Sequence, residues 1–166
     1  MRFPLLPVWK VDSITQLTPA ILEEKGIRLL MLDFDNTIVP YTTNEPTKEM
    51  AQWLQMITES SVEICVVSNS KKNRVKIFCD RYGIPCITHA KKPGTKGIRE
   101  CLSRYDLPKA NCALAGDQIY TDVLGGNSAG VQSILVKAIH NHNFWLKARG
   151  VLEIPWRIAA NKRRIV

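Results

Sequence analysis

The chain has 166 residues, of which 45% are hydrophobic, and a formal net charge of +8. This length fits a single compact domain over residues 1–166, and no apolar run is long enough to cross a bilayer. The N-terminal stretch, interrupted by Pro4 and Pro7, lacks a signal-peptide pattern, and none of the five cysteines forms a C-x-x-C pair. We therefore expect reduced core thiols in a cytoplasmic protein.

Strands and helices alternate along the chain between an N-terminal arm (about 1–25) and a basic C-terminal tail (about 137–166). Short apolar runs indicate five strands, at residues 28–32, 63–67, 84–87, 112–115 and 133–136. Apolar residues at helical spacing indicate three helices between them, one starting near Thr47, one ending near Gly83 and one over residues 98–105. The predicted fold class is α/β, a Rossmann-like parallel sheet with helices on both faces.

Polar or charged residues follow four of the five predicted strands. They are Asp33 after the first strand, Ser68 and Asn69 after the second, Lys91 and Lys92 after the third, and Gly116 and Asp117 after the fourth. Active sites of parallel α/β sheets form beyond the carboxyl ends of the strands. We therefore expect these side chains to meet at one edge of the sheet.

Asp33 and Asp35 lie two residues apart after the first strand. Two carboxylates in one small volume repel each other unless a cation or a proton compensates. Mg²⁺ prefers oxygen ligands and usually takes only one or two carboxylates. The pattern predicts a Mg²⁺ site at Asp33, Asp35 and Asp117, supported through a hydrogen bond by Asp122.

The remaining polar residues at this edge suit a phosphoryl group, whose oxygens need hydrogen-bond donors and positive charge. Thr37 and Ser68 offer hydroxyls and Lys92 offers a cation, with Lys91 as an alternative cation. Asn69 is expected to contact the same group. One carboxylate could attack phosphorus and form an aspartyl-phosphate, while the other protonates the leaving oxygen and then deprotonates water.

These residues resemble the four motifs of the haloacid-dehalogenase-like (HAD) phosphatases. The matches are Asp33-Phe34-Asp35-Asn36-Thr37 to D-x-D-x-T, then Ser68, then Lys92-Pro93, then Gly116-Asp117 with Thr121-Asp122. The resemblance implies Asp33 as the nucleophile and Asp35 as the general acid and base. It also implies metal ligation by Asp33, Asp117 and the backbone carbonyl of Asp35.

A closer resemblance covers nearly the whole chain. The stretches DFDNTIVPY, AKKPGTKG and GDQIYTDVLGGN are similar to the YqeG-type branch of this superfamily, which is related to phosphatidylglycerophosphate phosphatases. Two positions depart from that pattern, because Ser128 stands where a basic residue is expected and Tyr41 where tryptophan is expected. Neither lies in the four motifs, so both bear on the substrate rather than on the chemistry.

The intervals between the motifs leave no room for a cap domain. Between Asp33 and Ser68 the sequence predicts one loop, one helix and one strand, and between Ser68 and Lys92 one helix and one strand. The resemblance implies that such uncapped members act on bulky substrates or borrow a lid from a neighbouring chain.

Positive charge and aromatic residues gather at the ends of the chain. From Lys137 onward seven basic residues face one acidic residue, Glu153, a net +6. The aromatic residues outside the predicted sheet include Phe3, Trp9, Phe144, Trp145 and Trp156. This combination suits an anionic bilayer surface. The alternatives are a solvated basic end and aromatic side chains packed on the outer helices.

The favoured function is a phosphomonoesterase for phosphatidylglycerophosphate or another lipid phosphate, with peripheral contact at the inner membrane face through the basic tail. A second hypothesis is a phosphatase of another bulky substrate, such as a phosphoprotein or a nucleic-acid end. A third is a non-catalytic RNA- or ribosome-binding module. The pair Asp33 and Asp35 argues against the third, because binding alone gives no reason to keep two mutually repelling carboxylates.

Overall fold

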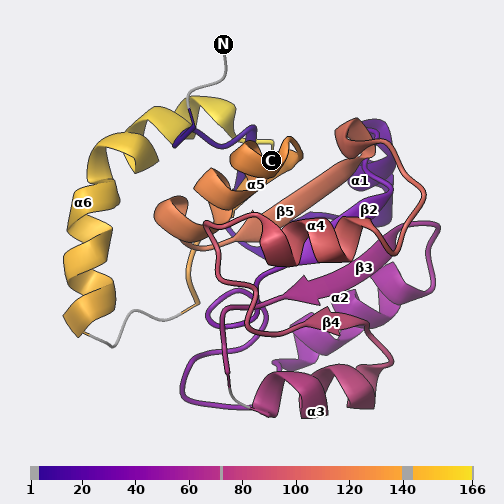
Figure 1. The fold of residues 1–166 in the computed structure, drawn as a ribbon. Helices are drawn as coiled ribbons and strands as arrows, with labels where there is room; N and C mark the ends of the chain where they lie inside the picture. The colour runs from indigo at the N-terminus through magenta and orange to yellow at the C-terminus, as the bar shows by residue number, and fades with distance from the viewer. Residues whose placement is uncertain (1–3, 72, 140–143, 166) are drawn as a thin grey trace.

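The computed structural model describes residues 4–71, 73–139 and 144–165, without the side chains of 144–150. Six parallel strands in this part of the chain form one sheet, in the order β1-β6-β5-β2-β3-β4 (Figure 1). The strands are β1 (Trp9–Val11), β2 (Leu29–Leu32), β3 (Glu63–Val67), β4 (Cys86–Ile87), β5 (Cys112–Gly116) and β6 (Gln132–Val136). The helices are α1 (Pro19–Glu24), α2 (Lys48–Thr58), α3 (Arg74–Tyr82), α4 (Lys96–Leu102), α5 (Leu124–Ala129) and α6 (Phe144–Ala160).

The pleat of the central strands divides the core into two layers, because successive side chains of a strand point to opposite faces. Leu30 and Leu32 of β2 pack in the layer that α1, α2 and α3 cover. Leu29 and Met31 pack in the layer that α4 and α5 cover. All four residues of β2 are buried, as expected for a strand with helices on both sides. The predicted fold class is confirmed.

Two predicted helix ends are present in the structure. The Thr47 side chain accepts a hydrogen bond from the backbone N–H of Met50 at 3.2 Å and so begins α2. Gly83 ends α3 with a φ of 65°, a left-handed conformation that glycine adopts without steric cost.

The N-terminal arm contributes an edge strand that the five-strand prediction lacks. β1 pairs in parallel with β6, with Trp9 opposite Ile134 and Val11 opposite Val136. The Trp9 indole N–H donates to the Gln132 side chain at 2.8 Å. Three residues between turn-forming segments are too few to show a strand period, so only the pairing with β6 reveals β1. Trp9 therefore belongs to the sheet itself and packs against the core, whereas the sequence analysis expected either a membrane surface or packing on the outer helices.

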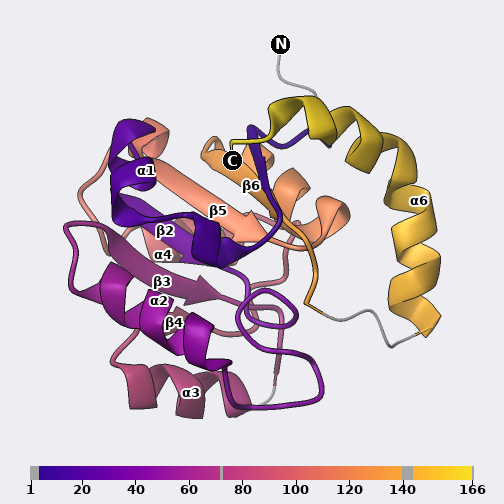
Figure 2. The ribbon, with the colours of Figure 1, turned by 180° about the vertical axis from the view of Figure 1, so that it is seen from behind.

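The basic tail forms α6, which the sequence analysis also lacks, because Pro155 lies inside it and proline usually ends a helix. α6 stands beyond the ends toward which the strand arrows point (Figures 1 and 2). Its last turns pack on the fold, with Trp156 and Ala160 against Ile119 and Leu135. Phe3 and the side chains of Phe144 and Trp145 lie outside the described residues.

The intervals between the motifs contain no inserted domain in the described residues. α2 and β3 lie between Asp33 and Ser68, and α3 and β4 lie between Ser68 and Lys92, as predicted. None of the helices described has the length and apolar character needed to cross a membrane. The five cysteines form no disulfide, and four of them are buried, which agrees with the predicted core thiols.

Candidate active site

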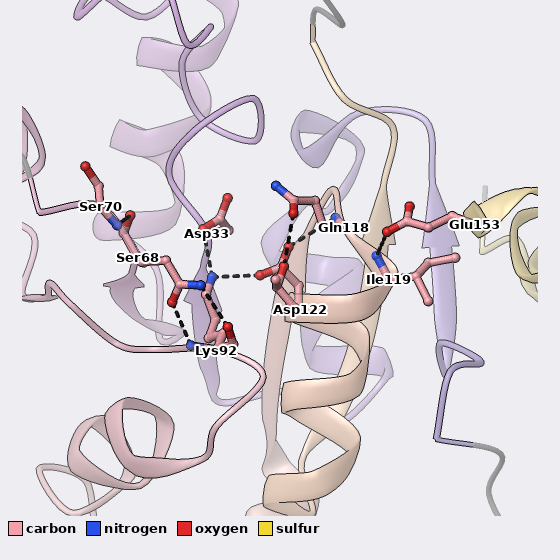
Figure 3. Close-up of polar contacts among 10 residues, drawn as sticks. Asp33, Ser68, Ser70, Lys92, Gln118, Ile119, Asp122 and Glu153 are labelled. Atoms are coloured by element: carbon pink, nitrogen blue, oxygen red, sulfur yellow. Dashed lines mark hydrogen bonds and ion pairs between the residues drawn. The ribbon is translucent and has the colours of Figure 1, made fainter. Parts of the chain in front are cut away.

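The four motifs meet at the carboxyl edge of the sheet. Asp33 follows β2 directly, and its backbone N–H donates to the Ala115 carbonyl of β5 at 2.8 Å. Ser68 follows β3, and its N–H donates to the Ile87 carbonyl of β4 at 2.9 Å. These backbone hydrogen bonds continue the sheet ladder by one residue beyond each strand. They therefore fix both residues at the rim, as Figure 3 shows.

The segment after Asp33 turns back on itself, which brings Asp35 to the same place. Asn36 has a φ of 61°, a left-handed conformation that asparagine tolerates better than most residues. Its N–H donates to the Val39 carbonyl at 2.7 Å, and the Phe34 carbonyl accepts from Ile38 at 3.0 Å. Asp33 and Asp35 consequently line one cavity of about 400 Å³.

A buried ion pair network joins three of the motifs. The Lys92 ammonium lies 2.7 Å from a carboxylate oxygen of Asp33 and 2.7 Å from one of Asp122 (Figure 3). Burial disfavours the charged form of Lys92, but Asp122 and Asp33 outweigh this and raise its pKa. Lys91, the alternative cation of the sequence analysis, is exposed and does not line the cavity. Lys92 is therefore the lysine at the centre of the site.

Asn69 holds the backbone of Lys92 in place. Its side-chain amide donates to the Lys92 carbonyl at 2.9 Å and accepts from the Lys92 N–H at 2.7 Å. This reciprocal pair aims the lysine side chain inward. Asn69 also lines the cavity, so its predicted contact with substrate stays a prediction.

Asp122 approaches Lys92 closely because Gly116 has no side chain. A Cβ atom on Gly116 would lie 2.3 Å from the carboxyl carbon of Asp122. The other carboxylate oxygen of Asp122 accepts from the Gln118 backbone N–H at 3.1 Å. Asp122 is thus held from two sides, and its supporting role at a metal site stays a prediction.

The acidic cluster of Asp33, Asp117 and Asp122 has the composition of a divalent metal site. Ligand atoms from the three carboxylates lie within 4.8 Å of one another. Burial raises the pKa of Asp33 to about 7 although Lys92 lowers it. Burial, and then the charges of Asp33 and Asp122, raise the pKa of Asp117 well above its usual value. One Asp117 oxygen is buried without a hydrogen-bond partner among the described residues, so a hard cation fits there.

The two predicted hydroxyl donors differ in access. Ser68 lines the cavity, and its hydroxyl oxygen accepts from the Ser70 N–H at 3.1 Å. Thr37 is 1% exposed, and its hydroxyl has no hydrogen-bond partner in the described part of the chain. Thr37 is not among the residues that line the cavity, and its predicted contact with phosphate stays a prediction.

Arg74, the first residue of α3, reaches the site although no motif points to it. One guanidinium nitrogen lies 3.1 Å from the Asp35 carboxylate and donates to the Tyr41 carbonyl at 3.0 Å. The other donates to the carbonyls of Pro40, at 3.2 Å, and Thr43. Arg74 therefore ties the loop beside the cavity to Asp35. In the sequence, only its position soon after the second motif indicates that Arg74 could reach the site.

Other residues that the motifs do not indicate also contribute to the site. Tyr41, Lys71 and Gln118 line the cavity. From α6, Glu153 and Arg157 contact the loop after β5. In the sequence, Glu153 stands out as the single acidic residue from Lys137 onward, although it belongs to no motif.

Comparison with known proteins places these motifs in a family. A family model described as mitochondrial PGP phosphatase matches residues 2–139. A probable phosphatase, YqeG, of Bacillus subtilis (strain 168) is 37% identical over 131 residues, which cover 79% of this chain and 76% of the relative.

Solved structures share the fold at low sequence identity. The cobalt-bound deoxy-D-mannose-octulosonate 8-phosphate phosphatase of Haemophilus influenzae is 12% identical, with a TM-score of 0.55 over 80% of this chain and 91% of its own. The 3-deoxy-D-manno-octulosonate 8-phosphate phosphatase of Moraxella catarrhalis, with its own magnesium, phosphate and sugar, is 14% identical, with a TM-score of 0.50 over 86% and 97%. These likenesses confirm the predicted HAD-like architecture.

Gly116→Ala should lower the free energy of unfolding by about 1–3 kcal/mol, the usual cost of forcing an extra methyl group into a packed interior. The added Cβ would displace the Asp122 carboxyl, which lies 2.3 Å from its position, and so disturb the contact with Lys92. Urea unfolding followed by circular dichroism measures the difference.

Gly126→Ala in α5 is the matched control, because its Cβ would meet Leu114 and Ser133 at 3.4 Å, an ordinary contact. We expect no loss of stability, since alanine is favoured over glycine in helices by about 1 kcal/mol. Equal unfolding free energies for Gly116→Ala and the unsubstituted protein would contradict the packing of Asp122 on Gly116.

Proposed function

The chain belongs to the mitochondrial PGP phosphatase family and is an HAD-type phosphatase, and we propose that it is a Mg²⁺-dependent phosphomonoesterase. In this proposal the enzyme forms an aspartyl-phosphate on Asp33. Its substrate is phosphatidylglycerophosphate or another lipid phosphate. The observation that carries the proposal is the position of the Asp33 carboxylate. It lines an open cavity, with the Lys92 ammonium at 2.7 Å and the Asp35 side chain lining the same cavity.

In the first half of the proposed reaction, an Asp33 carboxylate oxygen attacks phosphorus. An oxygen–phosphorus bond forms to Asp33, and the bond from phosphorus to the leaving oxygen breaks. Asp35 supplies the proton that the leaving oxygen takes up. Lys92 keeps Asp33 oriented and offsets the charge of the phosphoryl oxygens, together with the Ser68 hydroxyl.

In the second half, the Asp35 carboxylate takes a proton from water, whose oxygen attacks phosphorus. The bond between Asp33 and phosphorus breaks, inorganic phosphate leaves and the Asp33 carboxylate returns. Arg74 serves both halves by holding the Asp35 carboxylate at 3.1 Å while it fixes the adjacent loop. The arrangement of these side chains is what orients the two proton transfers.

Magnesium is the cation that we propose for the acidic cluster. Asp33, Asp117 and the backbone carbonyl of Asp35 would hold it, with Asp122 supporting through Lys92. When bound, Mg²⁺ would offset the negative charge that the carboxylates and the phosphoryl group bring together. The buried Asp117 oxygen without a hydrogen-bond partner in the described chain supports this assignment.

A lipid phosphate is supported by the outer face of α6, which stands beside the carboxyl edge of the sheet (Figures 1 and 2). Four large apolar side chains are exposed there, Val151, Leu152, Ile154 and Ile158, by 47–67%. Exposed basic residues follow at positions 162–164. Apolar residues beside basic ones suit an anionic bilayer, where each basic residue contributes about 1 kcal/mol. A bilayer bound there would present its headgroups to an uncapped cavity.

Asp33→Asn should reduce the hydrolysis of p-nitrophenyl phosphate by at least about a thousandfold, because the amide cannot act as the nucleophile. Circular dichroism should show an unchanged fold. Asp80→Asn, an exposed carboxylate of α3 paired with Lys76, is the control and should keep full turnover. Turnover by Asp33→Asn at the rate of the unsubstituted protein would exclude covalent catalysis at this residue.

Removal of divalent cations with EDTA should abolish hydrolysis, and added Mg²⁺ should restore it. Asp117→Ala should raise the Mg²⁺ concentration for half-maximal activity by at least about tenfold, since it removes a charged ligand. A Mg²⁺ titration of p-nitrophenyl phosphate hydrolysis measures both effects. Full activity in a demonstrably metal-free sample would be incompatible with the proposed metal site.

The lipid assignment predicts that the double variant Leu152→Glu, Ile158→Glu loses binding to anionic vesicles by roughly tenfold or more, because it places charge on the apolar face. Vesicle flotation measures binding, and phosphate release from phosphatidylglycerophosphate in vesicles should fall in parallel. Hydrolysis of soluble p-nitrophenyl phosphate should stay unchanged.

Ile77→Glu on α3, where the side chain is 60% exposed, is the matched control and should bind vesicles normally. If the unsubstituted protein ignores anionic vesicles at physiological salt and cleaves only soluble phosphates, the lipid substrate is wrong. A preference for phosphoprotein or nucleic-acid ends in the same assay would identify the alternative substrate class.

A further inference from the structure

An ion pair on α6, between buried Glu153 and half-buried Arg157, contacts the loop that carries two residues of the acidic cluster. Glu153 is 1% exposed, although the helix around it presents apolar side chains to the outside. One of its carboxylate oxygens accepts a hydrogen bond from the backbone N–H of Ile119 at 2.9 Å (Figure 3) and another from that of Tyr120 at 3.4 Å. α6 lies wholly beyond residue 139, where the family match ends.

Arg157, one turn later on α6, completes the contact. Its guanidinium donates to the second Glu153 oxygen through two nitrogens, at 3.0 and 2.6 Å. The same guanidinium donates to the backbone carbonyl of Asp117 at 2.7 Å. Both oxygens of the buried carboxylate are therefore satisfied, which is what a buried charge requires.

These contacts fix the backbone on both sides of a short loop. Arg157 holds the carbonyl of Asp117. Glu153 holds the N–H groups of Ile119 and Tyr120. Asp122 lies in the same helical turn, Ile119–Val123, that begins at this contact. A shift of the loop would consequently move Asp117 and Asp122 together relative to Asp33.

We propose that Glu153 and Arg157 are positioning residues that hold Asp117 and Asp122 in the geometry at which the acidic cluster binds its divalent cation. This inference rests on the proposed function, since it takes the cluster to be a metal site. Neither residue touches the reacting atoms. They act through the Asp117 backbone, in the way that groups behind the direct ligands of a metal site commonly set its affinity.

The apolar contacts of α6 allow the polar pair to be tested by itself. Trp156 and Ala160 pack against Ile119, Val123 and Leu135 independently of the ion pair. Substitution of Arg157 therefore leaves a hydrophobic attachment of α6 to the fold. The loss of the Asp117 contact can then be separated from detachment of the helix.

The test compares Arg157→Met with Arg163→Met. Both variants lose an arginine that donates to a backbone carbonyl, at 2.7 Å to Asp117 and at 2.8 Å to Pro7, but only the first contact lies at the acidic cluster. Binding of Mn²⁺, followed by electron paramagnetic resonance, gives the affinity without reference to activity. We expect Arg157→Met to weaken binding about 10- to 100-fold and Arg163→Met to leave it unchanged.

Glu153→Gln is the second variant, because its amide oxygen keeps an acceptor for the Ile119 N–H, while its amide nitrogen is a donor and cannot accept from Arg157. It should weaken Mn²⁺ binding by a smaller factor than Arg157→Met. In Mg²⁺ titrations of p-nitrophenyl phosphate hydrolysis, both should shift the half-maximal concentration upward. Turnover at saturating Mg²⁺ should change less than about threefold, since the reacting groups stay in place.

Unchanged Mn²⁺ affinity in Arg157→Met would overturn the inference and leave the phosphatase mechanism intact. Equal weakening in Arg163→Met would also overturn it, because the effect would then be general loosening of the tail. Absence of divalent cation binding by the unsubstituted protein would overturn the inference together with the proposed metal site.

Discussion

The position of the Lys92 ammonium between two buried carboxylates is the constraint on which the site depends. It lies 2.7 Å from Asp33 and 2.7 Å from Asp122, and its side chain is 1% exposed. Charges that are removed from water are tolerated only when they are paired with good geometry. Two neighbouring residues, Asn69 and Gly116, set that geometry. Asn69 fixes the backbone of Lys92, and Gly116 leaves the space that Asp122 occupies.

The charge balance of this cluster explains why one lysine is not sufficient. Three carboxylates and one ammonium leave a net charge of −2 when all are ionised. Burial raises the pKa of Asp33 and of Asp117, and the charges of neighbouring carboxylates raise both further. In the proposed function, a divalent cation would neutralise this charge and leave Asp33 ionised. The cluster is buried because it lies directly on the strand ends.

Residues outside the motifs secure the loops around the uncapped cavity. Arg74 secures the loop beside Asp35 from the first turn of α3. Glu153 and Arg157 secure the loop after β5 from α6. The outer face of α6 stays apolar and exposed, beside the carboxyl edge of the sheet (Figures 1 and 2). A protein without a cap can in this way combine firm loops with an open cavity.

Local patterns in the sequence determined the parallel α/β sheet and the four motifs at its carboxyl edge. Asp33 and Ser68 directly follow the buried apolar strands β2 and β3, so strand periodicity located them, whereas Lys92 lies five residues beyond Ile87, the end of β4. The tertiary structure alone decided which of Lys91 and Lys92 faces the carboxylates. The two residues are adjacent and of the same type, so the sequence pattern does not distinguish them. The tertiary structure also decided the roles of Arg74 and Glu153. The contacts of Arg74 with the loop beside Asp35 and of Glu153 with Ile119 span more than thirty residues of the chain, 34 in the second case, and no local period reports such contacts.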